Sequence, residues 1–106
     1  MSEPTPLDVR QTREFARWFA GLRDRRARAP IVNRIDRLAL GLAGDARSVG
    51  GGVSELRIHY GPGYRLYFTR RGDRIVLLLC GGDKSSQRAD IARAQEIVAT
   101  ETDDAD

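Results

Sequence analysis

Cysteine, histidine and lysine are all scarce in this 106-residue chain, which has only Cys80, His59 and Lys84 of these types. A single cysteine excludes an intrachain disulfide, and no group of His and Cys residues has the spacing of a zinc site. We therefore expect no metal or other cofactor, and a location in the reducing cytoplasm. No apolar run approaches the ~18 residues of a membrane span, and the start MSEPTPLDVR lacks a signal-peptide core. These absences predict a protein that is neither secreted nor bound to a membrane.

Acidic residues are unevenly distributed along the chain. With 18 basic and 15 acidic residues the formal charge is +3, but 101–106 holds four acids and no base, so the rest carries 18 − 11, or +7. Such a charge suits a polyanion such as RNA or DNA, although high arginine usage can also reflect coding bias. The length and the 41% hydrophobic content predict one small domain, 7–99, between flexible ends at 1–6 and 100–106.

Two apolar stripes at helical spacing predict two N-terminal helices. The first helix covers about 12–23. The second either begins near Pro30 or bends there, because proline has no N–H to donate and is tolerated in a helix's first turn. Leu7 and Val9 indicate a short strand before both helices, and the Gly-rich segment 41–54 is interpreted as a flexible connection because it lacks the ending of a phosphate loop. The stripes are Phe15, Trp18, Phe19 and Leu22, then Ile31, Ile35, Leu38 and Leu42.

The segment 55-ELRIHYGPGYRLYF-68 alternates apolar and polar residues on both sides of Gly-Pro-Gly and predicts a β-hairpin. If 61–63 form the loop, His59 lies opposite Arg65 and Arg57 opposite Tyr67. These four side chains then share the sheet face that points away from the helices that cover Ile58 and Leu66. The grouping suits phosphate and stacked bases, although the exposed face of an antiparallel sheet often carries charge. The same register pairs Tyr60 with Tyr64, Ile58 with Leu66, and Leu56 with Phe68.

The run 74-RIVLLLC-80 is apolar on both faces and predicts a central strand. It ends in a Gly-Gly pair, 81–82, which we expect to turn the chain sharply, and Ser85 or Ser86 can then cap a last helix. Lys84 falls between the end of this strand and the start of that helix, where anions bind readily. Its ammonium lies beside the two hairpin arginines if this strand neighbours the hairpin. The predicted apolar side of the last helix is Ile91, Ala94, Ile97 and Val98.

The blocks 54-SELRIHYGPGYR-65 and 81-GGDKSSQ-87, in this order, resemble the RelE/ParE superfamily of type II toxin–antitoxin toxins. The resemblance covers about 7–98 and is closest to the addiction-module killer protein branch, near HigB. It implies an α+β fold in which an antiparallel sheet packs against two N-terminal helices, with a C-terminal helix. It also implies a toxin that inhibits translation by metal-independent mRNA cleavage, commonly on the ribosome, and that a helix-turn-helix antitoxin neutralises. The ParE branch instead inhibits DNA gyrase without catalysis.

The same resemblance implies site residues. By motif, Arg65, Arg57 and Lys84 match the basic residues of the superfamily's nucleases, whereas the C-terminal tyrosine that some of them use has no counterpart here. The general base therefore stays open. We expect Arg57 and Arg65 to clamp phosphate, His59 to act as acid or base, Lys84 to donate a proton or hold phosphate, and Tyr67 to stack a base or assist proton transfer.

Overall fold

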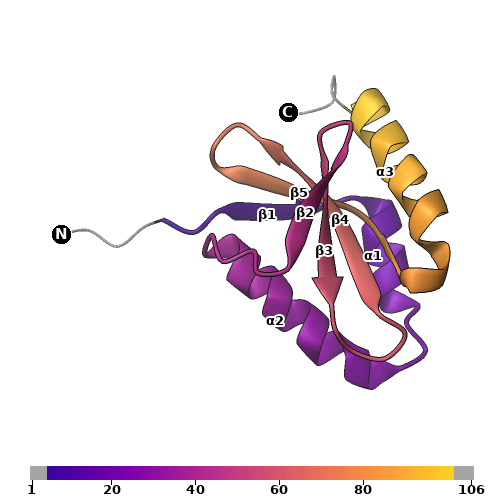
Figure 1. The fold of residues 1–106 in the computed structure, drawn as a ribbon. Coiled ribbons are helices and arrows are strands. Elements are labelled where there is room, and N and C mark those ends of the chain that lie inside the picture. Colours follow the sequence, from indigo (N-terminus) through magenta and orange to yellow (C-terminus); the bar gives the residue numbers. More distant parts are fainter. Residues whose placement is uncertain (1–4, 102–106) are drawn as a thin grey trace.

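Residues 5–101 are described by a computed structural model and form a five-stranded sheet with helices on both faces (Figure 1). Most of the two predicted flexible ends lies outside these residues, so their flexibility stays a prediction. Two short 3₁₀ turns, η1 (Arg25–Ala27) and η2 (Lys84–Ser86), precede the second and third helices. The elements are β1 (Asp8–Gln11), α1 (Arg13–Ala20), α2 (Arg28–Ala39), β2 (Ala46–Gly50), β3 (Val53–Ile58), β4 (Tyr64–Arg71), β5 (Ile75–Gly82) and α3 (Gln87–Glu101).

The strand order across the sheet is β1-β5-β4-β3-β2. All neighbouring strands are antiparallel except β1 and β5, which pair in parallel. The predicted α+β class is therefore confirmed, with one parallel pair at the edge added to it. The apolar strand β5 lies inside the sheet as predicted, because both of its faces are covered, while β4 occupies the middle position.

Each face of the sheet has its own apolar core. Helices α1 and α2 cover one face, and α3 covers part of the other (Figure 1). Burying each large side chain contributes roughly 1.5–3 kcal/mol, so the two clusters hold the layers together. The α1/α2 core includes Phe15, Ile31, Leu38, Leu56, Leu66 and Val76, and the α3 core includes Val53, Tyr67, Leu79, Cys80, Ala94 and Ile97.

Each N-terminal helix ends before the last residue of the stripe that predicted it, α1 at Ala20 and α2 at Ala39. Thr12 caps α1, because its Oγ1 accepts a hydrogen bond from the N–H of Phe15 at 3.0 Å and donates to the carbonyl oxygen of Leu79 at 2.6 Å. Helix α2 begins at Arg28, so Pro30 lies in its first turn. The late start was therefore the correct alternative for the second helix.

The predicted register of the hairpin is wrong by two residues. Ile58 pairs with Tyr64 and Arg57 with Arg65, so the loop between β3 and β4 is 59–63 rather than 61–63. A backbone turn closes this loop, with the N–H of Gly63 donating to the carbonyl of Tyr60 at 3.1 Å. A shift of two residues leaves every side chain on its predicted face, because strand side chains alternate with a period of two.

Two predictions about glycine-rich segments are also wrong. The segment 41–54 is not merely a flexible connection, because it contains β2 and a turn in which Gly50, Gly51 and Gly52 all have positive φ. Residues 81 and 82 do not turn the chain, since β5 runs through both. A Cβ atom on Gly81 would lie 2.4 Å from the Trp18 ring, and one on Gly82 would lie 1.8 Å from Oδ2 of Asp90. Close packing, rather than a bend, requires glycine there.

Candidate functional site

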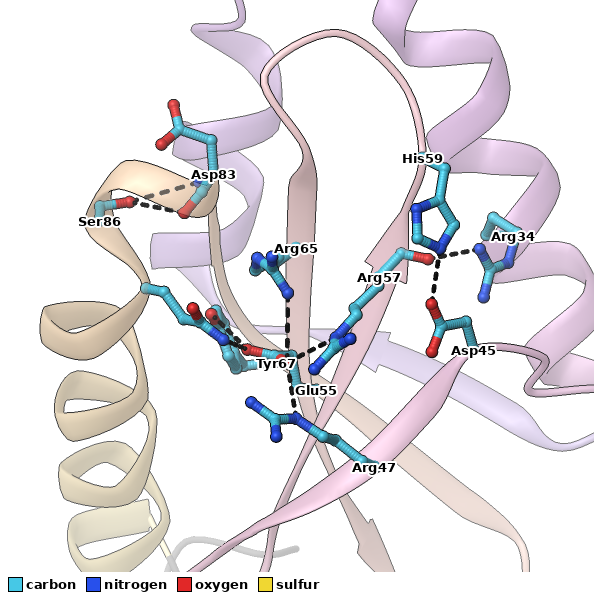
Figure 2. Close-up of polar contacts among 11 residues, drawn as sticks. Arg34, Asp45, Arg47, Glu55, Arg57, His59, Arg65, Tyr67, Asp83 and Ser86 are labelled. Carbon is cyan, nitrogen blue, oxygen red and sulfur yellow. Dashed lines mark hydrogen bonds and ion pairs between the residues drawn. The ribbon is translucent and has the colours of Figure 1, made fainter.

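A buried carboxylate, that of Glu55 in the middle of β3, organises the arginines of this protein (Figure 2). Its side chain is 0% exposed. Oxygen Oε1 accepts hydrogen bonds from Arg47 Nε at 3.2 Å, from Arg57 Nε at 3.3 Å and from Arg65 Nη1 at 3.4 Å. Three guanidinium groups thus meet one carboxylate, and the cluster keeps a net positive charge.

The second oxygen of Glu55 is also fully engaged. Oε2 accepts a hydrogen bond from the hydroxyl of Tyr67 at 3.1 Å and one from Nε2 of Gln87 at 2.8 Å. Burial by itself raises the pKa of Glu55, but hydrogen bonds from Gln87, Arg47, Arg57 and Tyr67 outweigh it and lower the pKa below the ordinary value of 4.5. The carboxylate is therefore ionised at neutral pH. Burial, then the charge of Glu55, raises the pKa of Tyr67, which stays a phenol.

A cavity of about 220 Å³ lies where the hairpin loop meets the end of β5. The 3₁₀ turn η2 lies against this loop, since a Cβ atom on Gly63 would be 3.6 Å from Cβ of Lys84. Four of the five predicted site residues meet here, and the expectation that Lys84 lies beside the two hairpin arginines is confirmed. The cavity is lined by Arg57, Ile58, His59, Gly63, Tyr64, Arg65 and Lys84.

His59 reaches this cavity from the loop rather than from the strand, so its predicted pairing with Arg65 is wrong. Its Nε2 lies 2.6 Å from Oδ2 of Asp45, and its side chain is 75% exposed (Figure 2). This contact leaves Nδ1 as the ring nitrogen that can exchange a proton with a ligand. Arg34 of α2 fixes the neighbouring backbone by donating to the carbonyl oxygen of Arg57 at 2.5 Å.

Tyr67 lies apart from the cavity, and its predicted position opposite Arg57 is wrong. It pairs with Glu55 across β3 and β4, and it is 0% exposed. Its hydroxyl points at the carboxylate of Glu55, away from solvent. In this arrangement the ring contacts the α3 core and holds Glu55 in place.

Asp83 caps η2, the turn that precedes α3, and the predicted cap of α3 itself by Ser85 or Ser86 stays a prediction. Oδ1 of Asp83 accepts a hydrogen bond from the N–H of Ser85 at 2.8 Å, and the hydroxyl of Ser86 completes a capping box (Figure 2). Hydrogen bonding from Ser85 lowers the pKa of Asp83 despite some burial. Because this carboxylate already holds the first N–H groups, Lys84 takes part in the site through its ammonium and not through an open helix end.

Four residues of the site were not identified from the sequence: Arg47, Asp45, Glu55 and Gln87. The available signal for Glu55 is that it is the one acidic residue in 55–68 and lies two positions before Arg57, on the same strand face. Arg47 and Asp45 fall in the segment interpreted as a flexible connection. Gln87 is 32 residues from Glu55 along the chain, so no local pattern joins them.

Across 5–101, no three His, Cys, Asp or Glu side chains gather as metal ligands. Likewise, none of the helices in that part of the chain is long and apolar enough to cross a membrane.

Solved structures show the class of fold. The chain is similar to a structure described as the chromosomal ParDE TA (toxin–antitoxin) system from P. aeruginosa, with a TM-score of 0.60 and 19% identity over 76% of this chain and 98% of that one. It is also similar to the conserved hypothetical protein HP0894 from Helicobacter pylori, with a TM-score of 0.48 and 20% identity over 74% of this chain and 96% of that one. The first similarity gives the fold as that of the RelE/ParE-like toxins.

The family follows from the sequence match. Residues 17–99 match the family described as phage-derived protein Gp49-like (DUF891), and the chain therefore belongs to it. An uncharacterized protein of Haemophilus influenzae is 45% identical over 89 residues, which cover 84% of this chain and 90% of that protein. The predicted resemblance to RelE/ParE-like toxins is thereby confirmed.

Proposed function

We propose that this protein is the toxin of a type II toxin–antitoxin system and that it inhibits translation by metal-independent mRNA cleavage. The observation that supports this most directly is the 220 Å³ cavity, which is lined by two arginines, one lysine and one histidine. Cleavage of RNA by its own 2′-OH requires a base for that hydroxyl, cations for the phosphate and an acid for the leaving oxygen. The cavity holds side chains suited to each of these roles.

Arg57 and Arg65 are the phosphate clamps in this proposal. Each donates one hydrogen bond to Glu55, and a guanidinium has five N–H donors in a rigid fork. Anchoring one side of the fork restricts the rotation of the group before the substrate arrives, so less entropy is lost when phosphate binds. Arg65 is the more buried of the two, since its side chain is 11% exposed and that of Arg57 is 34% exposed.

His59 and Lys84 are the proton-transfer residues. The contact of Asp45 with Nε2 of His59 orients the ring, as in other pairs in which a carboxylate positions a base, and leaves Nδ1 to accept the 2′-OH proton. Lys84 is exposed at the same cavity, where its ammonium can donate to the leaving oxygen or hold a phosphate oxygen. Tyr67 acts through Glu55 as a positioning residue, since its buried hydroxyl donates to that carboxylate.

A cognate antitoxin of the helix-turn-helix class is the proposed protein partner, and mRNA on the ribosome is the proposed substrate. The fold shared with a structure described as a ParDE TA system supports an antitoxin partner. The same similarity favours one alternative, a ParE-like protein that inhibits DNA gyrase by docking. That alternative does not require a cavity in which three cations and an imidazole meet.

The deciding experiment compares induced cells that carry the wild-type chain, Arg65→Ala, Arg65→Lys or Arg17→Ala. Arg17 is exposed on α1, away from the cavity, so its alanine variant makes the same charge change as a control. We expect growth arrest with loss of full-length mRNA for the wild type and for Arg17→Ala, and normal growth for Arg65→Ala. Broken DNA with trapped gyrase and intact mRNA would instead establish the alternative.

Further variants separate the roles. Retained binding to the antitoxin and an unchanged circular dichroism spectrum show that Arg65→Ala is folded, and Arg65→Lys tests whether charge without the fork is enough. His59→Gln should remove the limb of the pH–rate profile that arises from the base. If both Lys84→Ala and Lys84→Arg cleave RNA at the wild-type rate, Lys84 has no chemical role.

A further inference from the structure

A second, shallow cavity of about 280 Å³ adjoins the Glu55 cluster, which consists of Glu55 and the five side chains that donate hydrogen bonds to it. Arg47 of β2 lines it together with Gln87, Arg88 and Ile91 of α3. Two of these residues, Arg47 and Gln87, bind the same carboxylate that holds the arginines of the first cavity.

The two cavities are therefore neighbours that share one buried anchor. Arg47 Nε and Arg57 Nε both contact Oε1 of Glu55, at 3.2 and 3.3 Å, yet Arg47 lines the second cavity and Arg57 the first. Figure 2 shows Arg47, Arg57 and Arg65 converging on Glu55 from separate strands. Because the carboxylate is buried between them, a ligand that crosses the cluster meets guanidinium groups rather than the acid.

The lining of the second cavity suits one nucleotide. Arg47 and Arg88 come from different elements and supply two cations for a phosphate, while Ile91 is half-buried and offers an apolar surface for a base or ribose. Arg47 is 53% exposed and held at its Nε by Glu55, so its remaining N–H groups are preorganised for a ligand.

We propose that this cavity is a second nucleotide subsite, so that a single RNA strand lies across the Glu55 cluster. The scissile phosphate occupies the cavity of Arg57 and Arg65, and a flanking nucleotide occupies the cavity of Arg47 and Arg88. This inference rests on the proposed ribonuclease function. It adds a binding residue, Arg88, that takes no part in the Glu55 cluster and is exposed on α3.

The test uses 2′-fluoro RNA oligonucleotides of two, four and six nucleotides, which lack the attacking hydroxyl and are not cleaved. Their affinities for the wild type, Arg88→Ala, Arg88→Lys and the control Arg17→Ala are measured by fluorescence anisotropy at several salt concentrations. A dinucleotide fills only the first cavity, so the wild type should gain affinity between two and four nucleotides. Arg88→Ala should reduce this gain in affinity by a factor of at least about three. It should also make the slope of log affinity against log salt concentration shallower by about 0.7, the value for one single-strand phosphate contact.

Each remaining outcome has a definite meaning. Dinucleotide binding should be unchanged in Arg88→Ala, and Arg88→Lys should restore most of the tetranucleotide affinity because it restores the cation. If Arg88→Ala weakens all lengths equally, or behaves as Arg17→Ala does, the subsite is refuted while the ribonuclease proposal stands. If the wild type binds no oligonucleotide of any length while induced cells still lose full-length mRNA, the subsite is refuted and the ribonuclease proposal stands. If induced cells also keep their mRNA intact, the proposed function is wrong, and the subsite with it.

Discussion

Replacing Glu55 with alanine is the perturbation with the largest expected effect on stability. The variant removes the carboxylate that accepts five hydrogen bonds and leaves three guanidinium groups close together without an anion. Breaking a buried ion pair on one side costs about 3–5 kcal/mol. Arg47 and Arg57 remain 53% and 34% exposed and regain water, so we expect the low end, about 3 kcal/mol.

The measurement is urea and thermal unfolding of purified protein, followed by circular dichroism. For a domain of this size, a loss of ~3 kcal/mol corresponds to a fall of roughly 12–24 °C in Tm. Asp36→Ala removes an exposed carboxylate on α2 and should shift Tm by little. A Glu55→Ala protein within about 1 kcal/mol of the wild type would refute the idea that this carboxylate holds the cluster together.

The same carboxylate sets a pH dependence. Because the folded-state pKa of Glu55 lies below its unfolded value of 4.5, its contribution to stability is fully present above pH 4.5 and is lost as the pH falls toward the folded-state value. Glu55→Gln should therefore weaken the fall in unfolding free energy below pH 4.5. If the unfolding free energy of Glu55→Gln fell as steeply below pH 4.5 as that of the wild type, Glu55 would not be the source of this pH dependence.

Three further predictions concern the scaffold of the site. Thr12→Ala should cost about 1–2 kcal/mol in urea unfolding, because it removes the cap of α1 and the bond to Leu79, and Thr12→Ser should restore most of the loss. Gly82→Ala should cost about 1–3 kcal/mol, since its methyl group would overlap the Asp90 carboxylate, and a neutral result would disprove that contact. Burial raises the pKa of Cys80 to about 12, so a disulfide reagent at pH 8 should label it only on unfolding; rapid labelling of native protein would contradict this.

The helices and the inner strand were predicted because their signals are local. The stripe that includes Phe15 and the stripe that includes Ile31 and Leu38 need only helical periodicity, and these side chains are buried as expected. The run that forms β5 is apolar on both faces, which predicted that other elements cover both. In the structure each face packs against its own apolar core. Helix ends were predicted less accurately, since α1 was expected to reach about residue 23 but ends at Ala20, where the N–H of Gly21 bonds to the carbonyls of the last turn.

The hairpin shows where such patterns stop being informative. Alternation determined which side chains share a face, and that prediction holds for Arg57 and Arg65. It could not distinguish two registers that differ by two residues, because both give the same faces. The turn that ends at Gly63 determines which of the two registers forms, and it brings the two arginines directly opposite each other.

The sequence by itself determined the fold class through the resemblance of its motifs to a known family. It also determined the faces of the strands and the basic character of the site, because these follow from periodicity and composition within short segments. Only the tertiary structure decided what holds the arginines in place. The anion is Glu55, and its partners come from β2, β3, β4 and α3, so no one segment contains the signal. A buried charge is stable only when distant parts of the chain supply its hydrogen bonds, and that arrangement exists only once the sheet and α3 have assembled.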